Sequence, residues 1–147
     1  MSLLKSGGKM RETIKAFKIA AKAHKGQKDK GGKPYIWHPV IVAATVNDMK
    51  AIPIALLHDV VEDTEITIEQ IYECFSKETA EAVELLTKKP GLDYEKYLIG
   101  IKQNPLATAV KVADIKHNSN IKRISKPHEK DFKRLEKYKK ALKILED

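Results

Sequence analysis

The chain has 147 residues, one cysteine and a formal net charge of +8 at pH 7. This length suits one domain that buries a core without disulfides, and a lone cysteine excludes an intrachain disulfide framework, so Cys74 is expected as a small buried side chain in a reducing cytoplasm. The longest uncharged apolar runs, "IVAATV" and "AIPIALL", are too short to cross a membrane, and no signal peptide is expected.

The N-terminal part of the chain shows helical periodicity. Apolar residues at three- and four-residue steps predict a helix from Met10 to Lys25, after a segment 1–9 that is expected to be flexible. The stretch "GQKDKGGKPYIWHP" is rich in glycine and proline and is expected to be a loop. Its last residue, Pro39, suits the first turn of a helix that runs to about Met49. A third helix is expected over 51–63.

The C-terminal part continues in the same way. Thr67 and Gln70 match a capping box, which predicts that a helix opens at residue 68 and runs to residue 75. Further helices are expected over 77–89, 94–102 and 106–121, and after Pro127 to the end of the chain. No stretch shows the alternation of a strand, and there is no internal repeat. The sequence therefore predicts an all-α fold with one compact helical domain over 10–147.

The expected third helix carries an unusual group of charges in "IALLHDVVEDTE". At about 100° per residue, one face of this helix is apolar and the other holds an imidazole and three carboxylates, from His58, Asp59, Glu62 and Asp63. Carboxylates so close together repel one another, and burial would strengthen the repulsion. A divalent cation such as zinc, manganese or iron would relieve it, because imidazole and carboxylate are good ligands for these ions. The alternative is a solvated, charged helix face.

Two other segments supply further candidate ligands. His38 directly precedes Pro39 in an aromatic turn, and Asp114 interrupts an apolar helical seam together with Asn118. A buried carboxylate needs a partner, so Asp114 can complete a ligand set with His38, His58 and Asp59. Asn118, one turn later, could hold a substrate or orient a ligand. Judged separately, His38 also fits a packed loop histidine, and Asp114 also fits a surface or capping aspartate.

Four segments together carry a resemblance to a known family: "AHKGQ", "GKPYIWHP", "ALLHDVVEDT" and "VKVADIKHN". In their order and spacing over residues 12–145, the chain resembles the HD-domain hydrolases that act on (p)ppGpp. This group includes the hydrolase domain of RelA/SpoT proteins, the small stand-alone alarmone hydrolases and the metazoan SpoT homologues. The resemblance implies a compact helical bundle and a metal-dependent 3′-pyrophosphohydrolase that releases pyrophosphate from (p)ppGpp.

The resemblance also implies roles for individual residues. The ligands of one divalent ion, commonly manganese in the family, would be His38, His58, Asp59 and Asp114. Glu62 and Asp63 would be the catalytic carboxylates, and Asn118 would contact the substrate. His24 is expected only to pack, and the sequence assigns no role to His117 or His128.

The chain departs from the family pattern at Asp29, where relatives usually carry an arginine in Gln-x-Arg. Lys28 and Lys30 are the candidates to supply the positive charge there, although an ammonium group cannot reproduce the planar guanidinium. This departure keeps open a second reading, an HD phosphatase that acts on another small nucleotide or nucleotide cofactor.

A third reading is a basic helical module that binds nucleic acid or protein, because lysines gather in residues 15–33 and 122–143. These lysines lack the interleaved aromatic residues of a single-strand platform, so no stable nucleic-acid partner is expected. A small nucleotide, (p)ppGpp above all, is the expected partner, and no membrane association is expected. The sequence leaves the oligomeric state open.

Overall fold

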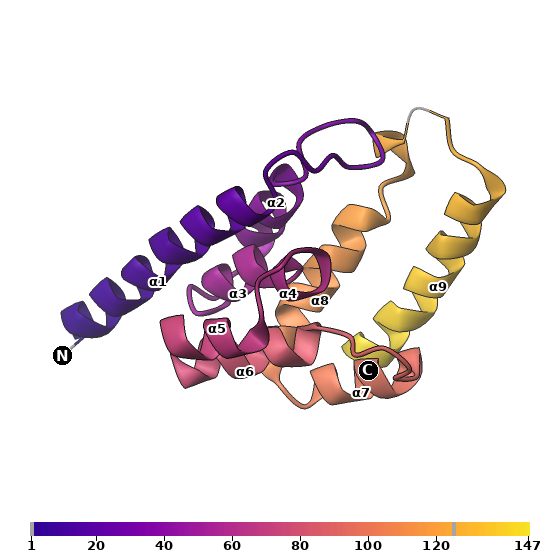
Figure 1. Cartoon of the computed structure of the whole chain (residues 1–147). Coiled ribbons are helices and arrows are strands. Elements are labelled where there is room, and N and C mark those ends of the chain that lie inside the picture. Colours follow the sequence, from indigo (N-terminus) through magenta and orange to yellow (C-terminus); the bar gives the residue numbers. More distant parts are fainter. Residues whose placement is uncertain (1, 125) are drawn as a thin grey trace.

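The computed structural model describes the backbone of residues 2–124 and 126–147, and the side chains of residues 8–124 and 126–147 (Figure 1). Met1, which belongs to the segment 1–9 expected to be flexible, lies outside the described residues. Within these ranges the elements are α1 (Ser2–Ala23), α2 (Trp37–Thr45), α3 (Ala51–Leu57), α4 (Val60–Asp63), α5 (Ile68–Cys74), α6 (Lys77–Leu86), α7 (Tyr94–Lys102), α8 (Pro105–Asn118), the 3-10 turn η1 (Ile121–Arg123) and α9 (Glu129–Glu146). The only β pairing in the described chain is an isolated bridge between Lys28 and Pro34. The predicted all-α class is confirmed.

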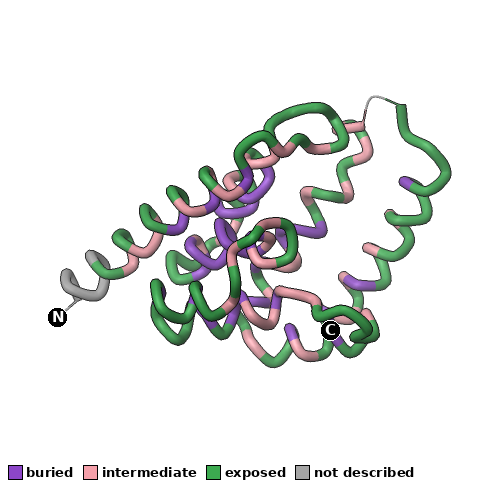
Figure 2. Tube along the Cα trace, in the orientation of Figure 1, coloured by how far each residue is buried: buried purple, intermediate pink, exposed green. Residues whose placement is uncertain are grey.

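The bundle is organised around α3. This short helix packs against α1, α2, α6 and α8, and α8 in turn contacts α2, α7 and α9. Every residue of α3 except Ile52 is buried, because neighbouring helices surround it. Figure 2 shows the buried positions concentrated on the inner helices and on the inward sides of the outer ones. Residues at the two ends of α3 and on the inner side of α8 are therefore shielded from water.

The expected helix over 51–63 is two helices, because it breaks at His58 and Asp59. The carbonyl oxygen of Ala55 accepts hydrogen bonds from His58 N at 3.4 Å and from the His58 side chain at 2.5 Å. In a continuous helix this oxygen would accept the N–H of Asp59 instead. Asp59 adopts φ −107° and ψ −2°, and α4 begins after it. The histidine side chain thus competes with the backbone and ends α3.

Other boundaries differ from the expectations in smaller ways. α1 begins at Ser2 rather than Met10, in a stretch without the regular apolar spacing that predicted the helix start. α2 begins at Trp37 and has Pro39 in its first turn, as expected, but it ends at Thr45 rather than near Met49. The turn before it leads into the helix, with Trp37 N donating to Pro34 O at 3.3 Å. α8 ends at Asn118, and the Asn120 side chain then caps η1 by accepting from Lys122 N at 3.1 Å.

The region around α5 contains one confirmed prediction and one wrong one. The capping box is present, since Gln70 N donates to Thr67 Oγ1 at 3.2 Å and Thr67 N donates to Gln70 Oε1 at 2.9 Å. Cys74, expected to be buried, is exposed. Ile71 and Phe75 face the core from this short helix, which leaves Cys74 on the outer side. No helix in the described part of the chain is long and apolar enough to cross a membrane.

Replacing Ile54 by alanine should lower the free energy of unfolding by about 3 kcal/mol, because a fully buried side chain at the centre of α3 would leave a cavity. Urea denaturation measures this loss. The control is Met49→Ala, which shortens a side chain that is 55% exposed and should change stability by less than about 0.5 kcal/mol. A loss at Ile54 no larger than at Met49 would contradict the central position of α3.

Candidate metal centre

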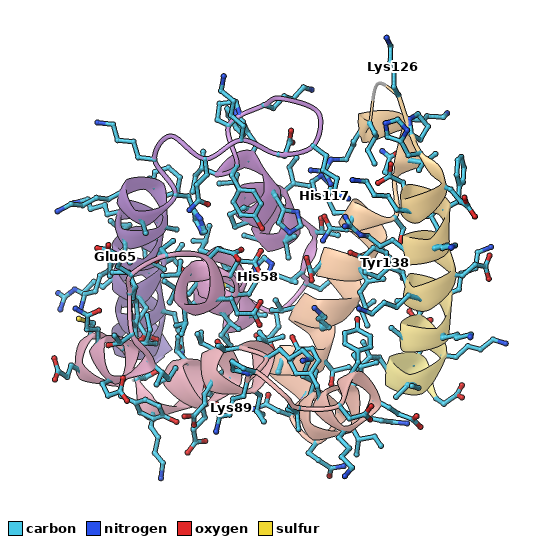
Figure 3. All side chains as sticks on the ribbon, turned by 45° about the vertical axis from the view of Figure 1, so that its right-hand side comes forward. His58, Glu65, Lys89, His117, Lys126 and Tyr138 are labelled. Carbon is cyan, nitrogen blue, oxygen red and sulfur yellow. The ribbon has the colours of Figure 1, made fainter. Side chains whose placement is uncertain are left out.

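Two histidines and two aspartates from separate segments meet in the interior of the bundle. His38 comes from α2, His58 and Asp59 from the α3–α4 bend, and Asp114 from α8. One possible ligand atom from each lies within 4.8 Å of the others. Figure 3 shows His58 in the middle of the molecule. The four residues predicted as metal ligands thus lie together, although Asp114 follows His38 by 76 positions.

Both imidazoles direct their Nε2 atoms at the same two carboxylates. His58 Nε2 lies 3.0 Å from Asp59 Oδ2 and 3.3 Å from Asp114 Oδ1. His38 Nε2 lies 2.8 Å from Asp114 Oδ1 and 3.8 Å from Asp59 Oδ2. Four donor atoms of the kinds that hold divalent ions therefore surround one small volume.

The orientation of His58 gives an independent test of whether a metal fits. Its Nδ1 donates to the Ala55 carbonyl, so in the neutral ring Nε2 carries the lone pair. That buried Nε2 has no hydrogen-bond partner among the described residues and faces carboxylate oxygens. Burial alone would lower the pKa of His58, but Asp59 and Asp114 hold it well above its usual value. The two carboxylates thus favour a positive charge next to Nε2, and a divalent ion would supply that charge.

His38 is held by a histidine to which the sequence assigned no role. His38 Nδ1 lies 2.7 Å from His117 Nδ1, and the two rings are within 15° of parallel. Burial, Arg123 and His38 lower the pKa of His117 to about 4. His117 is therefore neutral at pH 7, and its Nδ1 can accept a hydrogen bond. When His38 donates from Nδ1, its Nε2 is free to bind a cation. A His117 that accepts at Nδ1 would therefore hold His38 in the tautomer that a metal ligand needs.

Each aspartate of the cluster has support on its outer side. The Tyr35 hydroxyl donates to Asp59 Oδ2. Burial and the nearby charge of Asp59 raise the pKa of Tyr35, which keeps its proton in place.

Asp114 accepts from Lys111 Nζ at 3.1 Å and from Asn118 Nδ2 at 2.9 Å. Burial alone would raise the pKa of Asp114, but the neighbouring histidines and Lys111 hold it well below its usual value. Both aspartates of the cluster are therefore ionised at pH 7, as metal ligands must be.

The predicted catalytic carboxylates lie on α4, next to the cluster but outside it. Glu62 accepts from the backbone N–H of Lys88. The backbone carbonyl of Asp63 accepts from Gln27 Nε2 at 2.9 Å, while its carboxyl group is exposed. Burial, followed by repulsion from Asp59, raises the pKa of Asp63, and burial is also the largest cause of the raised pKa of Glu62. Both groups thus hold a proton more readily than an ordinary carboxyl group.

A cavity of about 270 Å³ opens on the other side of the cluster. His38 and Tyr35 line it at the metal centre, and so do the three residues predicted to bind substrate, namely Asn118, Lys28 and Lys30. Lys30 already forms an ion pair with Asp131 at 3.2 Å. The predicted substrate residues therefore share one cavity with one candidate ligand, His38.

Comparison with known proteins identifies the family. A family model described as HD domain matches residues 16–147. The chain belongs to the HD-domain family. Together with the four-residue cluster, this membership indicates a divalent metal site.

Curated relatives of this HD domain are much longer proteins. The bifunctional (p)ppGpp synthase/hydrolase SpoT of Escherichia coli is 36% identical over 118 residues, which cover 70% of this chain and 17% of that protein. The GTP pyrophosphokinase rsh of Brucella melitensis biotype 1 is 39% identical over 119 residues, which cover 71% of this chain and 16% of that protein. The chain thus spans less than a fifth of the length of these relatives.

A solved structure supports the fold of this HD domain. It is described as a metazoan ortholog of SpoT that hydrolyzes ppGpp and plays a role in starvation responses. The two chains align with a TM-score of 0.75 at 24% identity, over 91% of this chain and 85% of the other.

Four residues support the HD-domain site through contacts that the sequence did not predict: Tyr35, Lys111, His117 and Arg123. A partial signal existed for Lys111 and His117, because they lie three residues before and after Asp114 and can share its side of α8. Tyr35 and Arg123 gave no comparable signal, because their partners Asp59 and Asp29 are distant in the sequence.

Adding Mn²⁺ at about 100 times its dissociation constant should stabilise the protein by about 3 kcal/mol, because the ion binds the folded cluster and not the unfolded chain. Thermal unfolding with and without the ion measures this gain. Asp59→Ala should abolish it. Glu73→Ala, which removes an exposed carboxylate from α5, should keep it. Equal stabilisation of the Asp59 variant would refute the metal centre.

Replacing His117 by alanine should weaken Mn²⁺ binding about 10- to 100-fold, because His38 Nδ1 would lose the ring nitrogen that lies 2.7 Å from it and orients the imidazole. His117→Asn should recover part of the affinity, since its side-chain oxygen can accept from His38 Nδ1. Calorimetric titration with Mn²⁺ measures both. Equal affinities of the alanine and asparagine variants would show that only packing matters at this position.

Proposed function

We propose that this HD domain is a divalent-metal-dependent hydrolase that removes the 3′-diphosphate of (p)ppGpp as pyrophosphate. The observation that carries the proposal is the buried cluster of His38, His58, Asp59 and Asp114 beside a cavity with a basic wall. An acidic metal site next to basic side chains suits a polyphosphate substrate that binds an ion at one end. The names of the relatives, which include (p)ppGpp hydrolases, support this choice among nucleotides.

In this proposal the four clustered residues hold one ion, and we propose manganese. Two imidazoles and two carboxylates are a mixed nitrogen and oxygen set that suits zinc, iron or manganese, and the family resemblance favours manganese among them. When bound, such an ion acts as a Lewis acid toward a phosphoryl oxygen and makes a water more acidic.

The side chains of α4 are proposed to move the protons. Water adds to the phosphorus nearest the ribose, the bond from that phosphorus to the 3′ oxygen breaks, and the products are pyrophosphate and GDP or GTP. One proton must leave the attacking water and one must reach the 3′ oxygen. Glu62 and Asp63, whose pKa values are both raised, are the proposed acid and base.

The remaining residues are proposed to position the substrate. The side chain of Asn118 lines the cavity and already donates to a candidate ligand, Asp114, so it lies where metal centre and substrate would meet. Lys28 and Lys30 line the same cavity and add positive charge, which would attract a polyphosphate.

One observation favours a second candidate function, a phosphatase that acts on a different small nucleotide or nucleotide cofactor. Asp29 stands where the family pattern has an arginine, and it lies in the cavity wall. The same metal centre would serve both reactions. The product separates them, because a phosphatase releases orthophosphate and the proposed reaction releases pyrophosphate.

The manganese-loaded protein should release pyrophosphate from ppGpp and pppGpp, and little phosphate of any kind from NADPH or simple nucleotides. Quantifying pyrophosphate and orthophosphate over this panel tests the function. Orthophosphate from another member of the panel, with both alarmones untouched, would replace the proposed substrate.

Two variants should separate metal binding from proton transfer. Asp59→Ala should lose bound manganese and activity together, because a ligand is removed. Glu62→Gln should keep its manganese and lose at least about 100-fold in kcat, which is the usual size of a general acid–base contribution. Metal content by elemental analysis and turnover of ppGpp are the two measurements. Full activity of Glu62→Gln would exclude that residue from proton transfer.

A further inference from the structure

The cavity beside the metal centre is built from three segments that are distant in the sequence. The loop after α1 contributes 28–31, the end of α8 with η1 contributes Asn118, Ile121, Arg123 and Ile124, and α9 contributes Asp131, Arg134, Leu135 and Tyr138. His38 connects this cavity to the metal cluster. A molecule bound at the cluster can therefore extend along these walls.

Asp29 organises the loop wall and attaches it to η1. Its Oδ1 accepts from the backbone N–H groups of Gly31 and Lys33, each at 2.9 Å. Its Oδ2 lies 3.3 Å from Arg123 Nη2. Burial alone would raise the pKa of Asp29, but these contacts hold it below its usual value, so this carboxylate stays charged.

Gly31 shows how closely the loop and η1 approach each other. A Cβ atom at this position would lie 2.5 Å from the carbonyl oxygen of Arg123, a distance at which the backbone would have to move. Only a glycine allows this contact. The backbone of Arg123 and its side chain are thus both held by the same loop.

The guanidinium of Arg123 is oriented and still accessible. Besides Asp29, it contacts the carbonyl oxygen of His117 at 3.1 Å and Asn118 Oδ1 at 3.4 Å through Nη1. Its side chain remains 23% exposed and lines the cavity. A guanidinium has five N–H donors in one plane, so these contacts fix its direction without using all of its donors.

The charges of the cavity wall favour an anion. Its two acidic residues, Asp29 and Asp131, are each paired with a base, Arg123 and Lys30 respectively. Lys28 and Arg134 line the same cavity, and neither forms an ion pair with any residue that the structure describes. The wall therefore keeps positive charge after its internal pairs are counted.

The geometry points to Arg123 as the residue that binds the 5′-diphosphate of the nucleotide, with Asp29 as the positioning residue that holds it. This inference rests on the proposed function, in which the reacting 3′-diphosphate lies at the metal cluster. The nucleotide then needs a second cationic site for its other charged end, and the planar guanidinium fits a phosphate in a two-pronged manner that Lys28 and Lys30 cannot. A guanidinium absent at position 29 is thus supplied from position 123, and the carboxylate of Asp29 holds it in place.

The test is calorimetric binding of GDP and of guanosine to the manganese-loaded protein. GDP carries the 5′-diphosphate and no 3′ group, so it reports on this site without being hydrolysed at the 3′ position. Arg123→Gln should weaken GDP binding about tenfold or more, the effect of losing a charged hydrogen bond, and should change guanosine binding less than about twofold. With ppGpp as substrate, the same variant should raise KM and leave kcat within about twofold.

The matched control is Lys122→Gln, which removes the same charge from the neighbouring exposed residue of η1, outside the cavity wall. It should change GDP binding less than about twofold. Arg123→Lys keeps the charge, and its GDP affinity should lie between those of wild type and Arg123→Gln. If the glutamine variant does not fold, the lysine variant is the one to measure.

Three results would overturn the inference: equal GDP affinities for the glutamine variants at positions 122 and 123, equal loss of GDP and guanosine binding at position 123, or wild-type GDP affinity in Arg123→Lys. Failure of the inference is distinguishable from failure of the proposed function. If GDP binding depends on Arg123 but ppGpp is not hydrolysed, the anion site stands and the reaction does not.

Discussion

The hydrogen bond from His58 Nδ1 to the carbonyl oxygen of Ala55 is the contact on which the site depends. It takes the acceptor that the next helical N–H would use, and so ends α3. It also places the proton of the neutral ring on Nδ1, which turns the Nε2 lone pair toward the carboxylates. The same bend sets the direction of α4 and thereby places Glu62 and Asp63 beside the cluster. One side chain thus couples a backbone break to the geometry of four ionisable groups.

The interior of the bundle can hold these charges because each ligand is supported from outside. Tyr35 donates to Asp59, Lys111 and Asn118 donate to Asp114, and His117 faces His38. None of these contacts satisfies His58 Nε2, which is left in the centre among carboxylate oxygens. A buried polar atom without a partner is costly, so this arrangement favours a cation at the centre over an empty one. The support also limits the freedom of the ligands, which is how such sites hold their geometry.

Charge has opposite signs at the two ends of the proposed substrate site. The cluster and α4 are acidic, whereas the cavity wall formed by the loop after α1, η1 and α9 is basic beyond its internal pairs. A nucleotide with phosphates at both ends could bind an ion at the first and guanidinium groups at the second. The Asp29–Arg123 ion pair brings a guanidinium from a distant segment next to the position where the family pattern has an arginine.

The sequence by itself determined the helical class, the capping box at Thr67 and the residue types of the metal cluster. These follow from local periodicity and from short motifs, because each of these signals lies within one short segment of the sequence. The break at His58 and the exposed side of α5 that carries Cys74 were not predictable in the same way, because they depend on competing hydrogen bonds and on which neighbours cover a helix. Only the tertiary structure decided that His117 faces His38 and that Arg123 reaches Asp29 across 94 positions of the chain. The two side chains of each such contact are too far apart in the sequence for the helical repeat to place them together. Only the packing of the helices does so.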